Sequence, residues 1–275
     1  MTNATIIGCG YVGKAVAQQW RSTLTVTATT TTPDRVTELS SVAQNVRVVK
    51  GTDEAGLRSL LHDQAIVLLS VGAPHANAYE ETYLQTAKTL VAVLKDVPSV
   101  QQVIYTGSYA VYGDRQGDWV DETANVSPAN ANGELLAETE RVLLSATSET
   151  LKVCVLRLGG IYGPGRELVK IFGRAAGTTR PGNGEDAANW VHLDDIVGAI
   201  DFAREQSLTG IYNLVGSVPV TTKVLLERVF AAHSLPNAVW DASQTSTRPY
   251  NARVSNQTLR DAGYQFRYPE IVETV

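Results

Sequence analysis

The sequence predicts an α/β fold with a parallel central sheet, and two observations lead to this prediction. Short apolar segments alternate with helical patterns through the first 160 residues, and a glycine-rich motif directly follows the first apolar segment. Strands that alternate with helices form βαβ units, in which the strands run parallel. The predicted strands are Thr5–Ile7, Leu24–Ala28, Val46–Val49, Ala65–Val71, Val103–Tyr105 and Val153–Leu158, and the predicted helices are Val12–Trp20, Glu54–Leu61, Tyr79–Lys95 and Glu134–Ser145.

Composition and periodicity support these elements in chain order. Thr5–Ile7 is a short apolar strand that ends where the glycine motif begins, and Val12–Trp20 is the helix that the motif opens. Leu24–Ala28 is rich in β-branched residues, which favour strands. In Tyr79–Lys95 the apolar side chains share one face, as in a helix that covers a sheet. These side chains are Tyr83, Ala87, Leu90, Val91 and Leu94.

The organisation of the chain changes after Gly159. Residues 159–165 (GGIYGPG) and 181–184 (PGNG) are rich in turn-forming residues, and no repeat or low-complexity linker is present. We therefore expect one compact unit. It consists of a sheet domain over residues 1–160 and a smaller, loop-rich part over residues 161–275.

Composition excludes several classes of protein. The 275 residues are 44% hydrophobic and 19% charged, with a formal net charge of −5, which argues against disorder and against a basic nucleic-acid-binding surface. The apolar stretches are far shorter than the ~20 residues that span a bilayer, and the N-terminus lacks the features of a signal peptide. Cys9 and Cys154 form no paired motif, and no metal-ligand spacing is present. We expect a cytoplasmic protein with no membrane, nucleic-acid or metal partner.

Residues 8–13 (GCGYVG) form a G-x-G-x-x-G motif between the first strand and the first helix. In that context the motif is typical of a dinucleotide-binding turn. Gly8 permits the tight turn, Gly10 lets a pyrophosphate approach the backbone, and Gly13 lets helix and strand pack closely. Tyr11 and Val12 open the helix, whose N-terminus supplies N–H groups and the positive end of a dipole. The alternative is a glycine turn that binds no ligand.

The end of the second predicted strand bears on which dinucleotide binds. An NAD site usually carries Asp or Glu about 20 residues after the turn, but here the stretch 28–35 is ATTTTPDR. Thr29 and Thr30 can donate to a 2′-phosphate, and Arg35 can pair with it. Asp34 follows Pro33 and is better interpreted as a cap of the next helix. We expect NADP, with NAD as the alternative, although β propensity alone also explains the threonines.

Four further segments resemble one known family in the order in which that family has them. They are residues 103–113 (VIYTGSYAVYG), 156–165 (LRLGGIYGPG), 190–196 (WVHLDDI) and 211–214 (IYNL). With the glycine turn they cover roughly residues 1–220. On these segments the chain resembles the extended short-chain dehydrogenase/reductases, which are the NAD-dependent epimerase/dehydratase group.

The resemblance implies a fold and a chemistry. The fold is a seven-stranded, doubly wound parallel Rossmann sheet with a small C-terminal substrate-binding subdomain, and segments near residues 188–216 return to the sheet. Family members act mostly on nucleotide sugars and related carbonyl or alcohol substrates, and transfer a hydride to and from a nicotinamide. A Ser or Thr, a Tyr and a Lys carry out the proton chemistry. Many relatives pair through helices beside the catalytic helix, which leaves a homodimer open.

The catalytic pattern departs from the family at two positions. Ser108 stands at the position of the family's Ser or Thr, but residues 132–140 read NGELLAETE where the family has Tyr-Gly-x-Ser-Lys-Leu-x-x-Glu. Asn132 therefore replaces the Tyr and Leu136 replaces the Lys. Asn does not titrate near neutral pH, and Leu cannot lower the pKa of a phenol. General acid–base catalysis typically accelerates a reaction about 10²–10⁴-fold, and the side chains at these two positions cannot supply it.

Few residues nearby can substitute for the missing pair. Tyr109 follows Ser108 in the same loop, and packing of that loop explains it better. His75 follows the fourth strand and has the ordinary pKa of an acid or base, but a solvated loop histidine is the simpler interpretation. Glu134 opens the next helix, where the dipole stabilises a carboxylate.

The remaining candidates are placed by strand ends and by charge. Ser70, Val71, Gly72 and Thr106 lie at predicted strand ends, where ligands of such sheets bind. Arg166, Trp190 and Arg248 are candidate substrate contacts, because Arg suits phosphate, although surface pairing explains the arginines equally well. Asp195 is interpreted as a helix cap.

Two functions stay open. The first is an NAD(P)-dependent oxidoreductase or epimerase that acts on a nucleotide sugar or a small carbonyl or alcohol substrate with a non-standard acid/base. The second is a catalytically inactive NAD(P)-binding sensor or partner-binding protein.

Overall fold

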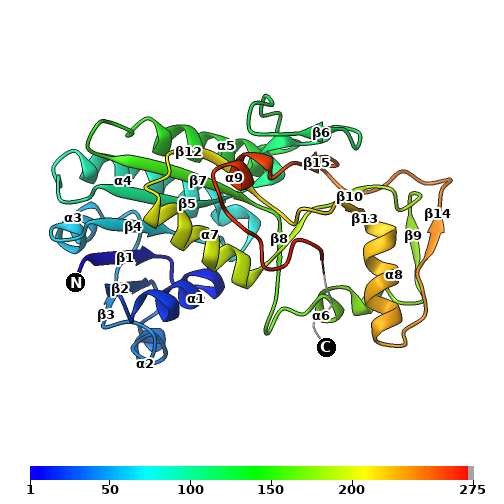
Figure 1. Ribbon diagram of the computed structural model, residues 1–275, viewed down its shortest axis with the longest axis horizontal. Coiled ribbons are helices and arrows are strands. Elements are labelled where there is room, and N and C mark those ends of the chain that lie inside the picture. Colours follow the sequence, from blue (N-terminus) through cyan, green and yellow to red (C-terminus); the bar gives the residue numbers. More distant parts are fainter. Residues whose placement is uncertain (272–275) are drawn as a thin grey trace. The chain divides into compact units, whose positions relative to one another are not determined.

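The computed structural model describes residues 1–271 and is built on one seven-stranded sheet (Figure 1). Its strands lie in the order β12-β7-β5-β4-β1-β2-β3. β1 pairs in parallel with both β2 and β4, and the pairs β2–β3 and β4–β5 are also parallel. The strands are β1 (Asn3–Ile7), β2 (Thr25–Thr30), β3 (Asn45–Val48), β4 (Ile66–Leu69), β5 (Gln102–Ser108), β7 (Lys152–Leu158) and β12 (Gly210–Leu214). This confirms the predicted α/β fold with a doubly wound parallel sheet.

The direction of strand order reverses at β1, because the chain first builds outward through β2 and β3 and then returns to β4. Such a switch point leaves a crevice outside the carboxyl ends of the two central strands, which is where ligands of open α/β sheets bind. The glycine motif directly follows β1, so it lies at this switch point.

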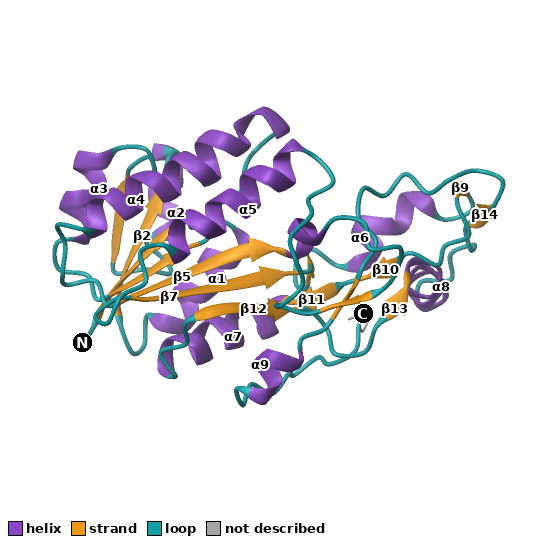
Figure 2. Cartoon of the chain, turned by 90° about the horizontal axis from the view of Figure 1, so that it is seen from above, coloured by secondary structure: helices purple, strands orange, loops and turns teal. Residues whose placement is uncertain are grey.

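Helices cover both faces of the sheet (Figure 2). α3 packs on α4 and α4 on α5 along one face, and α1 and α7 lie along the other, where Trp20 Nε1 donates to Asp201 Oδ1 at 2.9 Å. The helices are α1 (Tyr11–Trp20), α2 (Val36–Leu39), α3 (Glu54–Leu61), α4 (Thr86–Leu94), α5 (Ala131–Leu144), α6 (Leu168–Phe172), α7 (Leu193–Glu205), α8 (Thr222–Ala232) and α9 (Gln257–Asp261). Short 3-10 helices are η1 (Pro33–Arg35), η2 (Ala76–Ala78), η4 (Tyr109–Tyr112) and η5 (Gly173–Ala175).

The predicted helix Tyr79–Lys95 forms in two parts. Its first part is a π-helical segment, η3 (Glu80–Gln85), and its second part is α4. Of the predicted apolar face, Ala87 and Leu90 are fully buried in the sheet core, and the other three residues, Tyr83, Val91 and Leu94, are partly buried against it. Burial of side chains of this kind is worth about 1.5–3 kcal/mol for each large one.

The chain divides into two compact units. The first comprises residues 1–108, 131–157 and 197–212, and the second comprises residues 109–130, 158–196 and 213–275, of which 272–275 lie outside the described part. The second unit contains two-residue and three-residue strands: β6 (Trp119–Val120), β8 (Gly160–Tyr162), β9 (Thr179–Pro181), β10 (Ala187–Ala188), β11 (Trp190–His192), β13 (Val220–Thr221), β14 (Val239–Asp241) and β15 (Arg253–Val254). They pair as β8–β11, β9–β14, β6–β15 and β10–β13, and only the last pair is antiparallel.

Hydrogen bonds from buried asparagines, rather than long strands, connect the segments of the second unit. Asn189 donates to the Ala252 carbonyl at 2.8 Å and accepts from the Val254 N–H at 3.1 Å. Asn213 donates to the Ser255 carbonyl at 2.9 Å and accepts from the Tyr112 hydroxyl at 2.8 Å. Amide side chains carry both donors and acceptors, so they satisfy backbone groups that short strands leave unpaired.

Between residues 1 and 271 no helix has the length and apolar character that crossing a membrane requires.

Candidate functional site

The glycine turn has the geometry that its three glycines predict. Gly8 has φ +87°, and a Cβ there would lie 2.6 Å from the Ser70 carbonyl oxygen. A Cβ on Gly13 would lie 2.6 Å from the Gly8 carbonyl oxygen, so α1 and β1 pack too closely for any side chain. Gly10 is exposed, and a Cβ there would meet nothing within 4 Å. The turn therefore presents an open backbone cradle at Gly10 between two positions that are closed, and this fits a pyrophosphate.

The turn is tied to the end of β2. Gly8 N–H donates to Thr29 Oγ1 at 3.1 Å, and Cys9 N–H donates to the Thr29 carbonyl at 3.2 Å. Thr29 is thus a structural partner of the turn, and its hydroxyl is already engaged there. Burial raises the pKa of the Cys9 thiol to about 11, so the one side chain between the first two glycines stays neutral.

The strand ends beside the turn carry the predicted polar residues. Thr106 Oγ1 donates to Ser70 Oγ at 3.1 Å and lies 3.4 Å from the Leu69 carbonyl, which links the carboxyl ends of β4 and β5. Val71 is partly buried beside them, and Gly72 is exposed with no heavy atom within 4 Å of a Cβ position. The loop that follows is held by Tyr83, whose hydroxyl accepts from Ala73 N–H at 3.4 Å.

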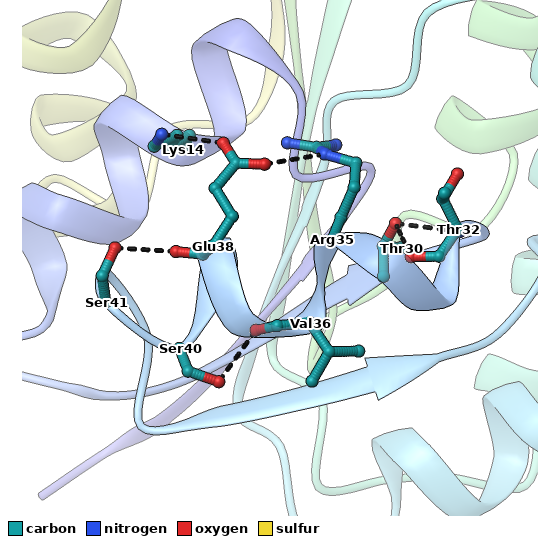
Figure 3. Close-up of polar contacts among 8 residues, drawn as sticks. All are labelled: Lys14, Thr30, Thr32, Arg35, Val36, Glu38, Ser40 and Ser41. Atoms are coloured by element: carbon teal, nitrogen blue, oxygen red, sulfur yellow. Dashed lines mark hydrogen bonds and ion pairs between the residues drawn. The ribbon is translucent and has the colours of Figure 1, made fainter.

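α2, which follows β2 and η1 in the chain, carries a charged group that the sequence did not predict. Glu38 in α2 accepts from Lys14 Nζ at 2.7 Å through Oε1 and from Arg35 Nε at 3.0 Å through Oε2 (Figure 3). Both cations lower the pKa of the Glu38 carboxyl to about 2. The i, i+3 spacing of Arg35 and Glu38 could have predicted the contact between these two residues. No local pattern predicts the contact of Lys14, which is 24 residues away from Glu38.

Two other residues at this strand end are placed by local geometry. Thr30 Oγ1 accepts from Thr32 N–H at 3.0 Å, which closes a tight turn after β2. Asp34 lies inside η1, and neither Thr32 nor Arg35, at the N-caps of η1 and α2, makes a side-chain capping bond. The interpretation of Asp34 as a helix cap is therefore wrong. The 3-10 turn that Pro33 starts places Asp34 within the turn.

The catalytic region is formed by the end of β5 and the start of α5. Ser108 is the last residue of β5 and is partly buried. Asn132 lies in the first turn of α5, and Leu136, in the second turn, is 7% exposed. Further along α5, Glu140 forms a buried ion pair with Arg157 of β7 at 2.8 Å, which fixes the helix on the sheet. Neither Asn132 nor Leu136 carries a group that exchanges a proton near neutral pH.

The substitute candidates differ in their surroundings. His75 is exposed at the start of η2 and makes no side-chain capping bond. Glu134 is exposed in the first turn of α5. Tyr109 is 7% exposed, and burial raises its pKa to about 12, so its hydroxyl stays protonated at neutral pH. None of the three has a geometry that singles it out as the acid/base.

The predicted substrate contacts belong to the second unit. Arg248 is partly buried and donates to Thr222 Oγ1 at 2.7 Å and to the Tyr109 hydroxyl at 3.3 Å. These neutral partners orient its guanidinium without neutralising its charge. Trp190 packs its ring on Gly160, where a Cβ would lie 2.8 Å from ring atoms. Arg166 is exposed in a turn that its N–H closes on the Gly163 carbonyl at 2.8 Å.

Asp195 has a role that the sequence analysis misread. It is fully buried, and its carboxylate accepts from Arg267 N–H at 2.7 Å and from Tyr268 N–H at 2.9 Å. The Tyr264 hydroxyl donates to the Asp195 carbonyl at 2.8 Å. Asp195 therefore holds the C-terminal segment, and its interpretation as a helix cap is wrong. Partners about 70 residues later in the chain leave no local pattern.

Comparison with known proteins agrees with this geometry. Residues 4–214 match the model of a family described as the NAD dependent epimerase/dehydratase family. The protein YeeZ of Escherichia coli K12 is 30% identical over 98% of this chain and 97% of its own length.

Solved structures share the fold at low identity. The UDP-N-acetylglucosamine 4-epimerase of Methanobrevibacter ruminantium M1, in complex with UDP-N-acetylmuramic acid, has a TM-score of 0.79 at 18% identity, over 96% of this chain and 92% of that one. The dTDP-glucose 4,6-dehydratase of Bacillus anthracis Ames, in complex with NAD, has a TM-score of 0.79 at 16% identity, over 98% of this chain and 92% of that one. The family match agrees with the predicted resemblance, and the chain belongs to the NAD-dependent epimerase/dehydratase family.

Proposed function

We propose that this protein binds a nicotinamide dinucleotide at the glycine turn and acts as an oxidoreductase or epimerase on a nucleotide sugar or a small carbonyl or alcohol substrate. The observation that carries the proposal is the open cradle at Gly10, which lies between two positions, Gly8 and Gly13, where no side chain fits. Because no protein atom fills the space beside Gly10, a pyrophosphate can approach the backbone there. Tyr11 and Val12 open α1 directly behind it and present the helix N-terminus to the pyrophosphate.

NADP is the proposed form of the cofactor, with NAD as the alternative. The end of β2 lacks the carboxylate that accepts from a ribose 2′-OH and instead carries Thr30 followed by Arg35. Lys14 adds a second cation to the same side. Two cations and a hydroxyl suit a 2′-phosphate better than a neutral 2′-OH. Val71, Gly72, Ser70 and Thr106 are proposed neighbours of the nicotinamide half, since they lie at the carboxyl ends of β4 and β5.

The chemistry is divided between the cofactor and the chain. The nicotinamide, when bound, supplies hydride transfer. Ser108 is proposed to hold the reacting oxygen of the substrate by donating a hydrogen bond. Because Asn132 and Leu136 cannot supply a proton, the acid/base is another group, for which His75 and Tyr109 remain the weak candidates.

The substrate class rests on the second unit and on the family. Arg248, oriented by Thr222 and Tyr109, is proposed to bind an anionic group such as a diphosphate, with Arg166 and Trp190 as further contacts. The two structural neighbours above are named for UDP-linked and dTDP-linked sugars, which supports a nucleotide-linked substrate here.

Binding and turnover measurements test the proposal in sequence. Purified protein is titrated with NADPH and with NADH by nicotinamide fluorescence, and saturable binding with NADPH the tighter ligand is expected. A panel of UDP- and dTDP-linked sugars and small carbonyl compounds is then screened for cofactor-dependent conversion. No binding of either nucleotide at millimolar concentration would overturn the proposal. Tight binding without conversion across the panel would favour the non-catalytic sensor.

Two further expectations are tested separately. We propose a homodimer, as the family resemblance suggests, and light scattering of the eluted protein distinguishes a dimer from a monomer. We also propose a cytoplasmic location, which fractionation of the producing cells checks.

A further inference from the structure

Lys14, Glu38 and Arg35 form a charge triad on the surface of the first unit (Figure 3). The Glu38 carboxylate uses one oxygen for each cation, with Oε1 at 2.7 Å from Lys14 Nζ and Oε2 at 3.0 Å from Arg35 Nε. The side chains of Lys14 and Glu38 are each 42% exposed and that of Arg35 is 35% exposed. Water and a soluble ligand can therefore reach all three charges.

The triad lies beside the glycine turn. Lys14 follows Gly13 directly in the first turns of α1, and its N–H donates to the Gly10 carbonyl at 2.9 Å. Arg35 ends η1, the short helix that follows β2, and β2 is tied to the turn through Thr29. The two cations therefore flank the strand end at which a dinucleotide of this fold places its adenosine ribose.

From this arrangement we propose that Glu38 is a specificity-determining residue that competes with the ribose 2′-phosphate for Lys14 and Arg35. This inference rests on the proposed function, because it needs the dinucleotide to bind at the glycine turn. To bind both cations, a 2′-phosphate must break the two ion pairs that they form with Glu38. A 2′-OH binds without breaking them. Glu38 therefore lowers affinity for NADP while it leaves affinity for NAD nearly unchanged, and it sets how strongly the protein discriminates between them.

The chemistry of the two competitors supports the exchange. A phosphate carries about −1.5 to −2 charges at neutral pH and three acceptor oxygens, and a carboxylate carries one charge and two oxygens. The phosphate therefore displaces Glu38 from both cations, but the two existing ion pairs must be broken. The low pKa of Glu38, near 2, keeps this competitor ionised at any physiological pH.

The test uses two nucleotides that differ only at the 2′ position. Binding of 2′,5′-ADP and of 5′-AMP is measured by calorimetry at low ionic strength for the wild type and for Glu38→Gln. The control is Glu54→Gln, which removes a more exposed helical carboxylate (59% against 42% for Glu38) from an ion pair with Arg58 on α3.

The expected result is a selective gain. Glu38→Gln should tighten 2′,5′-ADP about three- to tenfold, because two exposed ion pairs no longer need to be broken. It should change 5′-AMP less than twofold, and Glu54→Gln should change neither ligand. The gain should shrink at 0.5 M salt, because screening weakens all of these exposed contacts. Lys14→Gln and Arg35→Gln should each weaken 2′,5′-ADP and leave 5′-AMP unchanged.

Two results would overturn the inference. An unchanged ratio of the two affinities in Glu38→Gln would show that Glu38 does not compete. A loss of 5′-AMP binding in that variant would show that Glu38 accepts from the 2′-OH itself. If the wild type binds neither nucleotide, nor NADPH or NADH, the proposed function fails as well, and this outcome is distinct from binding without an effect of Glu38.

Discussion

The guanidinium of Arg157 on β7 donates to both oxygens of the Glu140 carboxylate on α5, with Nη2 2.8 Å from Oε2 and Nε 3.2 Å from Oε1. Both side chains are at least 96% buried. Because this pair joins the helix to the sheet, it fixes the positions of Asn132 and Leu136, two turns and one turn earlier in α5. A close neighbour is Gly107, where a Cβ would lie 3.0 Å from Glu140 Oε1.

Removing one partner of this pair should destabilise the first unit strongly. Arg157→Met leaves a buried carboxylate without its cation, and we expect the free energy of unfolding in urea to fall by about 3–5 kcal/mol. The double variant Arg157→Met with Glu140→Leu should recover much of that loss, because two apolar side chains need no partner. Arg141→Met, which removes an exposed ion pair on the same helix, should cost no more than about 1 kcal/mol. Equal losses for Arg157→Met and Arg141→Met would contradict this reading of the pair.

Two glycines of the turn should respond differently to alanine. Gly13→Ala puts a Cβ 2.6 Å from a backbone oxygen and should destabilise the fold by about 1–3 kcal/mol, as overpacking does. Gly10→Ala meets no protein atom, so it should change thermal stability far less while it weakens NADPH binding at least tenfold. Melting curves and fluorescence titrations of both variants check this. If Gly10→Ala binds NADPH as tightly as the wild type, the cradle is not the pyrophosphate site.

Ser108→Ala should separate catalysis from cofactor binding. If Ser108 holds the substrate oxygen, its removal should lower kcat/KM by about 10²–10³, as loss of one transition-state donor does. The Kd for NADPH should stay within twofold of the wild-type value. Steady-state kinetics on the substrate found by screening make the comparison, with Ser145→Ala, at the exposed position just after α5, as the control. Unchanged kinetics in Ser108→Ala would remove it from the active site.

Stability should fall on the acid side of neutrality because of His192. This side chain is 2% exposed, and burial lowers the pKa of its imidazole, although Asp194 and Asp195 partly offset the effect. Its Nδ1 accepts from Asp194 N–H at 3.1 Å, which also requires an unprotonated nitrogen. The unfolded chain therefore binds the proton more readily, and the free energy of unfolding should decrease as pH falls through about 6.5.

Urea unfolding between pH 8 and pH 5 measures this dependence. His192→Gln should flatten the curve over that range, whereas His62→Gln, at an exposed position, should follow the wild type. Identical pH dependence in the wild type and His192→Gln would show that His192 does not contribute.

Local patterns determined most of what the sequence predicted correctly. The six predicted strands correspond to β1–β5 and β7, and Glu54–Leu61 has the predicted bounds. These elements depend on apolar periodicity and on runs of β-branched residues, and both patterns are recognised within a few residues of sequence. The glycine turn is likewise contained within six residues, and its neighbours on either side are the strand and helix that it requires.

Other features came only from the tertiary structure. The contacts of Lys14 with Glu38, of Arg157 with Glu140 and of Asp195 with Tyr268 join residues 17 to 73 positions apart. The buried asparagines of the second unit do the same, and no periodicity marks them. A polar side chain is satisfied by whatever donor or acceptor the fold brings within about 3 Å, and that distance depends on how elements pack.

The sequence by itself therefore determined the α/β class, the glycine turn and the family, because each is a matter of residue identity at short spacing. Only the tertiary structure decided that Thr29 supports the turn, that Asp195 holds the C-terminal segment, and that Glu38 occupies the two cations beside the β2 end. The physical reason is that electrostatic and hydrogen-bond partners are chosen by proximity in space, and chain order alone does not set that proximity.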